Sequence, residues 1–260
     1  MKLPIYQVDA FSSHVFGGNP AAVCPLEAWI DDRSLQQIAE ENNLSETAFF
    51  VPESDDSFHL RWFTPVNEVD LCGHATLATA HVLFACMGYS NKLIRFNTRS
   101  GELVVSRSGQ GYDMEFPADY PEPAAVENLE EILGIKPLAV SRGISDLLVE
   151  VEDEKAIRQL DPDFRLMAEL PFRGCIVTAP GSETDIASRC FYPAYGIDED
   201  PVTGSAHTTL FSYWSRRWKR DHLTAVQLSK RGGIIEGRVR GNRVILSGNA
   251  VLYLKGEITV

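Results

Sequence analysis

The 260-residue sequence lacks long hydrophobic runs and paired cysteines. No apolar stretch reaches the roughly 20 residues that cross a bilayer, and Met1–Phe11 alternates polar with apolar residues, unlike a signal peptide. Its five cysteines are an odd number, widely spaced and without a CxxC pair, which is typical of reduced thiols. We therefore expect a cytoplasmic protein with no membrane partner.

Positive charge is also scarce. The sequence has 24 Lys and Arg against 36 Asp and Glu, a formal charge of −12, and its longest basic cluster is Arg216, Arg217, Lys219 and Arg220. Because an acidic surface repels phosphate backbones, nucleic acid is not an expected partner. The motifs of dinucleotide sites, P-loops, zinc proteases and hydrolase elbows are missing, and no metal site is predicted.

What the sequence does contain is an internal repeat. Phe63-Thr64-Pro65 recurs as Phe191-Tyr192-Pro193 at an offset of 128, and Cys72-Gly73-His74-Ala75 faces Thr203-Gly204-Ser205-Ala206 at an offset of 131. Three residues are therefore inserted in the second copy, and Asp200 is assigned to this insertion. A Pro-rich stretch marks the boundary between halves 1–117 and 118–260, with the last strand free to pack back on the first half.

The expected elements also repeat. In the first half we predict an amphipathic helix over Asp32–Asn42, a helix over Gly73–Met87, and strands at 58–63, 103–106 and 112–116. In the second half we predict the strand matching 58–63 at Cys175–Ala179, helices near 162–170 and at 205–218, and strands at 234–239 and 243–247.

The helix over Gly73–Met87 is apolar all round and must be buried, yet at about 22 Å it is too short to cross a membrane. We therefore predict an α+β fold of two pseudo-symmetric, barrel-like sheets, each around a central buried helix, with a ligand cleft between the halves. Each buried helix begins in a small-residue turn, where unpaired backbone N–H groups can hold a carboxylate. For one turn alone, ordinary helix-start chemistry explains the residues equally well; the repeat favours the anion site.

An asymmetric active site is expected where the halves differ. Glu46 corresponds to Gly174 at the 128 offset, so it is either a general base at a strand end or a solvated loop residue. Asp200 is either a cap or a ligand for a substrate amine. His74 could donate a hydrogen bond or act as a general acid. Cys72 is either a small buried residue or a thiol activated by the helix start.

Six ordered motifs resemble the PhzF family, the phenazine-biosynthesis isomerase-like proteins. They span nearly the whole chain: Tyr6–Phe11, Phe16–Ala21, Ser45–Phe49, Phe63–Pro65, Cys72–Thr76 and Asp200–His207. The resemblance implies a diaminopimelate-epimerase-like fold and a cofactor-independent isomerase, often homodimeric, acting on a small carboxylate-bearing substrate. In this family a catalytic carboxylate at the position of Glu46 moves a proton between substrate carbons.

The resemblance also assigns the other site residues. His74 and Asp200 match polar catalytic positions, while the substrate-contacting loops are matched by Ser45, Gly73, Gly204 and Ser205. Cys72 matches the first thiol of the two-cysteine epimerases, and Thr203 stands in place of the second. Two alternatives stay open: an epimerase or racemase using Glu46 and Cys72, and a non-catalytic protein that binds a small acid.

Overall fold

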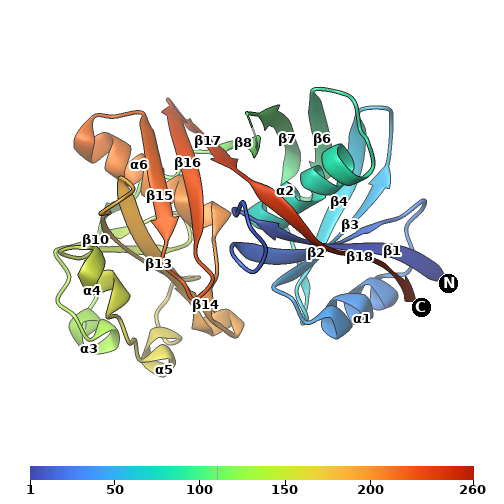
Figure 1. The fold of residues 1–260 in the computed structure, drawn as a ribbon. Coiled ribbons are helices and arrows are strands. Elements are labelled where there is room, and N and C mark those ends of the chain that lie inside the picture. The colour runs from blue at the N-terminus through green and yellow to red at the C-terminus, as the bar shows by residue number, and fades with distance from the viewer. Residues whose placement is uncertain (110) are drawn as a thin grey trace. The chain divides into compact units, whose positions relative to one another are not determined.

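The protein is described by a computed structural model that covers residues 1–109 and 111–260 (Figure 1). It divides into two compact units. The N-terminal unit comprises Met1–Glu115 together with Ser247–Val260, and the C-terminal unit comprises Phe116–Leu246. The last strand of the chain therefore belongs to the first unit. No helix among the described residues is long and apolar enough to cross a membrane.

In the N-terminal unit, one mixed sheet has the order β18-β1-β2-β3-β4-β6-β7-β8, with β2/β3 and β4/β6 parallel and the other pairs antiparallel. The short strand β5 pairs with β4. The strands are β1 (Lys2–Ala10), β2 (Asn19–Pro25), β3 (Glu46–Pro52), β4 (Ser57–Phe63), β5 (Glu68–Val69), β6 (Leu93–Thr98), β7 (Gly101–Ser108), β8 (Gly111–Pro117) and β18 (Ala250–Thr259).

The C-terminal unit repeats this topology. Its order is β10-β11-β12-β13-β15-β16-β17, again with two parallel pairs, β11/β12 and β13/β15. The short strands β9 and β14 pair with β10 and β13. The strands are β9 (Glu122–Pro123), β10 (Ala139–Arg142), β11 (Leu147–Glu150), β12 (Cys175–Pro180), β13 (Ile186–Tyr192), β14 (Ile197–Asp200), β15 (His222–Gln227), β16 (Gly233–Arg240) and β17 (Arg243–Gly248).

Strand register fixes the correspondence between the units. Thr47 lies opposite Phe63, and Cys175 lies opposite Phe191, so β3 matches β12 and β4 matches β13. The prediction that Cys175–Ala179 matches the strand at 58–63 was therefore wrong; Ile186–Tyr192 does.

The register also places the insertion. Trp62 pairs with Val69 and Cys190 pairs with Asp200, so Asp200 is the counterpart of Val69 at an offset of 131. Its assignment to the insertion was wrong, because the extra residues precede it, around the 3-10 turn η2 (Pro193–Tyr195).

Each unit has one central helix. In the N-terminal unit it is α2 (Gly73–His81), buried from Gly73 to Ala80 and continued by the π-helical turn η1 (Val82–Cys86), which confirms the predicted buried helix. Helix α2 contacts β1, β2, β3 and β18, while Phe84 of η1 stacks on Tyr112 of β8, so the sheet curls around it. The buried Thr76 and Thr79 hydroxyls donate to backbone carbonyls one turn back, which satisfies them.

The central helix of the C-terminal unit is α6 (Gly204–Trp218), close to the prediction. It contacts β15 and β16, and Trp214 donates its indole N–H to Thr178 on β12. The predicted outer helix α1 (Asp32–Asn42) is confirmed, with Asp31 as its N-cap. Its counterparts are shorter: α3 (Leu129–Leu133), α4 (Glu154–Arg158) and α5 (Phe164–Met167).

Candidate active site

Three candidate residues converge at the start of α2. Glu46 opens β3, Cys72 is the residue before the helix, and His74 lies in its first turn. His74 Nε2 lies 3.0 Å from Glu46 Oε2, and the Cys72 Sγ lies 3.5 Å from His74 Nδ1. All three side chains therefore meet in one small polar cluster inside the N-terminal unit.

The surroundings of this cluster are largely dry. Cys72 and His74 are each 5% exposed, and the Glu46 side chain is 14% exposed. Asn19, the first residue of β2, is fully buried and places its amide nitrogen 3.2 Å from His74 Nδ1. Within the described chain, the buried Glu46 Oε2 accepts no hydrogen bond of normal geometry. A buried carboxylate oxygen without a donor is uncommon and is available to a ligand or a proton.

The electrostatics of the cluster favour protons on its thiol and its imidazole. Burial raises the pKa of Cys72 to about 11, assisted by the negative charge of Glu46 and opposed by His74. For His74, burial lowers the pKa, but the neighbouring Cys72 and Glu46 outweigh it, so the pKa lies well above its usual value. At neutral pH the cluster therefore contains a thiol and a cationic imidazole beside Glu46.

The start of α2 is not capped by a side chain within the described chain, because Cys72 makes no side-chain cap hydrogen bond. The same holds for Thr203 at the start of α6. Uncapped N–H groups at the positive end of a helix dipole attract anions. Both turns that the sequence singled out, with Gly73 and Gly204 as first residues, therefore have the geometry of a carboxylate site.

The C-terminal candidates form a different kind of cluster. Thr203 donates its hydroxyl to Asp200 at 2.5 Å, and Gln227 accepts from the Thr203 backbone at 2.8 Å while donating to the Asp200 carbonyl at 2.7 Å. Ser205 accepts from Arg173 at 3.0 Å, and the same guanidinium makes a bidentate pair with the buried Asp146. These contacts hold the loop before α6 in a fixed shape.

The two clusters differ at every position that carries chemistry. Register places Gly174 where the first unit has Glu46, and a Cβ atom there would lie 2.2 Å from the Tyr192 ring. No larger side chain fits there without a shift. The 131 offset likewise replaces Cys72 by Thr203 and His74 by Ser205.

The structure thus groups Glu46, Cys72, Gly73 and His74 in one unit, with Ser45 next to them in sequence, and Asp200, Thr203, Gly204 and Ser205 in the other. Sequence reasoning missed Arg173, Asp146 and Gln227. Arg173 could have been found, because it stands at the 128 offset from the candidate Ser45. Gln227 gave no local signal.

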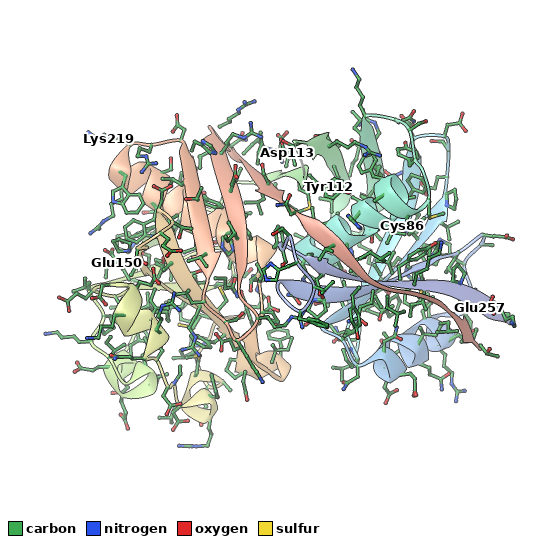
Figure 2. The ribbon with its side chains drawn as sticks, in the orientation of Figure 1. Cys86, Tyr112, Asp113, Glu150, Lys219 and Glu257 are labelled. Atoms are coloured by element: carbon green, nitrogen blue, oxygen red, sulfur yellow. The ribbon has the colours of Figure 1, made fainter. Side chains whose placement is uncertain are left out.

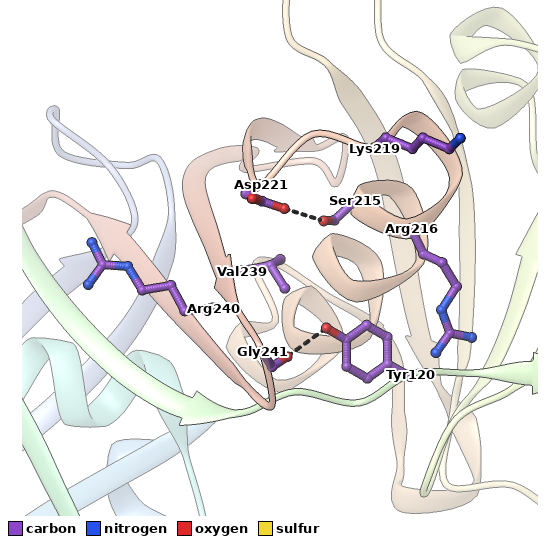
Figure 3. Close-up of a pocket in the computed structure, with 8 residues that line it drawn as sticks. All are labelled: Tyr120, Ser215, Arg216, Lys219, Asp221, Val239, Arg240 and Gly241. Carbon is purple, nitrogen blue, oxygen red and sulfur yellow. Dashed lines mark hydrogen bonds between the residues drawn. The ribbon is translucent and has the colours of Figure 1, made fainter.

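A separate pocket in the C-terminal unit contains none of these candidates. It has a volume of about 580 Å³ and is lined by residues of α6, β16 and neighbouring loops (Figure 3). Its polar groups bond to one another: Tyr120 donates to the Gly241 carbonyl, and Ser215 donates to Asp221. The chemistry therefore lies at the helix starts and not in this pocket.

The fold and the sequence both have known relatives. The sequence profile of the family described as phenazine biosynthesis-like protein (PhzC-PhzF) matches residues 8–256. An uncharacterized isomerase of Pseudomonas aeruginosa is 54% identical over 99% of both chains. A crystal structure of a PhzF family phenazine biosynthesis protein from Enterococcus faecalis covers 100% of both chains at 45% identity, with a TM-score of 0.97.

A hydroxyproline epimerase from Agrobacterium vitis shares the fold at 9% identity, with a TM-score of 0.63 over 99% of this chain and 92% of its own. The architecture is therefore that of the diaminopimelate-epimerase-like proteins, as predicted. Within this class, the chain belongs to the PhzF family.

Proposed function

We propose that the protein is a cofactor-independent isomerase in which Glu46 moves a proton on a small carboxylate-bearing substrate. The observation that carries the proposal is the buried Glu46 Oε2, which accepts no normal hydrogen bond from the described residues and lies 3.0 Å from His74. In the reaction, a substrate C–H bond breaks and its proton passes to the carboxylate. The same proton, or one exchanged with water, then returns at another carbon, so nothing is oxidised or reduced.

The helix start next to Glu46 supports this chemistry. The uncapped N–H groups from Gly73 onward would stabilise the negative charge that develops when the C–H bond breaks. His74 would hold a substrate oxygen or deliver a proton. In the C-terminal unit, the fixed loop with Asp200 and Thr203 and the start of α6 at Gly204 and Ser205 would bind the amino and carboxylate groups of the substrate.

The test uses deuterium. The protein is incubated with pooled cell metabolites in deuterated water, and compounds that gain mass are identified by mass spectrometry. A labelled compound should lose its labelling with Glu46→Gln, because general-base catalysis contributes about 10²–10⁴-fold. The control is Glu40→Gln on the exposed face of α1, which should label at the normal rate. Full labelling by Glu46→Gln would contradict the assigned base.

One observation favours a second function. The ligand atoms of Cys72, Glu46 and His74 all lie within 4.8 Å of one another, so Cys72 could serve as a second base in an epimerase. An epimerase would invert a stereocentre, and Cys72→Ala would abolish exchange in one direction. Isomerisation by Glu46 alone predicts a rearranged product and a Cys72→Ala protein that retains most of its rate.

We further propose a cytoplasmic homodimer. The five cysteines are unpaired thiols, four of them buried, which suits a reducing compartment. Light scattering on the purified protein would measure twice the 28.9 kDa chain mass. A single-chain mass at micromolar concentration would contradict the dimer.

A further inference from the structure

The cluster at the start of α2 contains three side chains that bind soft metal ions: a thiol, an imidazole and a carboxylate. Glu46, Cys72 and His74 each offer one ligand atom, and these atoms lie within 4.8 Å of one another. We infer that they form a binding site for Zn²⁺, and that the bound ion blocks proton transfer by Glu46. The metal site stands without the proposed function; only its inhibitory effect rests on that function.

The distances suit a tetrahedral zinc ion. With Zn–S near 2.3 Å and Zn–N and Zn–O near 2.0–2.2 Å, tetrahedral ligands lie about 3.3–3.6 Å apart. Cys72 Sγ lies 3.9 Å from His74 Nε2, which lies 3.0 Å from Glu46 Oε2. Shifts of a few tenths of an ångström would close the site. Three protein ligands leave the fourth position for water, as in catalytic zinc sites.

Two further contacts favour a ligand at this place. The buried Glu46 Oε2 accepts no normal hydrogen bond within the described residues, so an ion would not displace an existing partner. Asn19 lies against Nδ1, the other ring nitrogen of His74, and such outer contacts orient metal-binding imidazoles. The rotation of an amide is assigned and not observed, and a half-turn would present the Asn19 oxygen to an Nδ1–H group.

The ligand set also determines which ion binds. A thiolate with an imidazole prefers Zn²⁺ or Co²⁺, whereas Mg²⁺ and Ca²⁺ prefer oxygen ligands. Binding converts the Cys72 thiol to a zinc-bound thiolate and releases its proton to water, together with the extra proton of the imidazole. No electron is transferred. The C-terminal unit has Gly174, Thr203 and Ser205 at the same positions, so it offers no matching site.

The experiment measures metal binding on the full chain by equilibrium dialysis. We expect one tightly bound Zn²⁺ per chain, lost with Cys72→Thr and with His74→Asn, and unaffected by excess Mg²⁺. Cys72→Thr installs the residue that the second unit carries at this place, and circular dichroism would confirm its folding. Asn19→Ala should weaken binding by about 10–100-fold. The controls are Cys86→Ser, on η1 in Figure 2, and His222→Asn at an exposed histidine; both should bind normally.

Cobalt provides a second readout. Co²⁺ bound by wild type should show a thiolate-to-cobalt charge-transfer band that is absent from Cys72→Thr. Equal zinc binding by wild type and Cys72→Thr, or a cobalt complex without that band, would overturn the inference. Zinc should also stop Glu46-dependent deuterium incorporation, and a chelator should restore it. If zinc binds through Cys72 but no compound is ever labelled, the metal site stands and the isomerase proposal fails.

Discussion

The two units have the same strand order and the same central helix but different chemistry where the helix begins. In the C-terminal unit, Asp200, Thr203 and Ser205 all engage in printed hydrogen bonds to neighbouring side chains. In the N-terminal unit, the described contacts leave the buried Glu46 Oε2 without a normal hydrogen-bond donor. Satisfied buried networks hold a shape, whereas an unsatisfied buried group is available for reaction. The comparison indicates that one repeat positions and the other reacts.

The largest expected effect concerns how each helix fills its own sheet. Phe211 of α6 is fully buried, and at the 131 offset its counterpart on α2 is Ala80. Phe211→Ala, which copies the first unit, should lower the free energy of unfolding by about 3–5 kcal/mol, because it leaves a cavity. Urea denaturation would measure this. Leu138→Ala, at a side chain 63% exposed, is the control. A cost below about 1 kcal/mol would mean that the two interiors are interchangeable.

The shared architecture was largely predictable from the sequence. The repeat offsets, the buried helix at Gly73–Met87 and the outer helix α1 are local patterns, and local patterns survive folding. The convergence of Glu46, Cys72 and His74 followed from their positions at a strand start and a helix start.

Other features could not be predicted, because they depend on which strands pair. The match of β13 with β4, and the placement of Asp200 opposite Cys190, are consequences of register between distant segments. The Arg173–Asp146 pair joins residues 27 positions apart, and a sequence without an alignment carries no record of such a contact. Three short helices replace one long outer helix in the second unit for no reason that a local pattern reveals.

The next effect tests a position where the two helices solve one problem differently. The Thr76 hydroxyl donates to the Cys72 carbonyl at 2.6 Å, and its counterpart His207 makes the same contact through Nδ1 to the Thr203 carbonyl at 2.7 Å. Burial lowers the pKa of His207 to about 4, although the contact with Thr203 opposes the shift. His207 is therefore neutral in the folded protein, and its buried Nε2 has no partner among the described residues.

This shift makes stability depend on pH. In the unfolded chain the histidine takes up a proton near pH 6.5, whereas the folded protein does so only near pH 4. Stability is therefore complete above pH 6.5 and falls as the pH falls toward 4, at about 1.4 kcal/mol per pKa unit or about 3 kcal/mol in total. His207→Thr, which copies Thr76, should flatten this part of the profile when urea denaturation is repeated across the range. Parallel profiles for the two proteins would contradict the assignment.

The smallest expected effect tests why only one unit carries the carboxylate. At Gly174 a Cβ atom would lie 2.2 Å from the Tyr192 ring and 2.8 Å from the Phe191 carbonyl oxygen. Gly174→Ala should therefore cost about 1–3 kcal/mol of unfolding free energy, the usual range for overpacking. Gly256→Ala, whose new Cβ would meet its neighbours at ordinary distances of 3.7 Å or more, should cost much less. If Gly174→Ala is as stable as wild type, packing does not exclude a side chain there, and the missing carboxylate of the second unit needs a functional explanation.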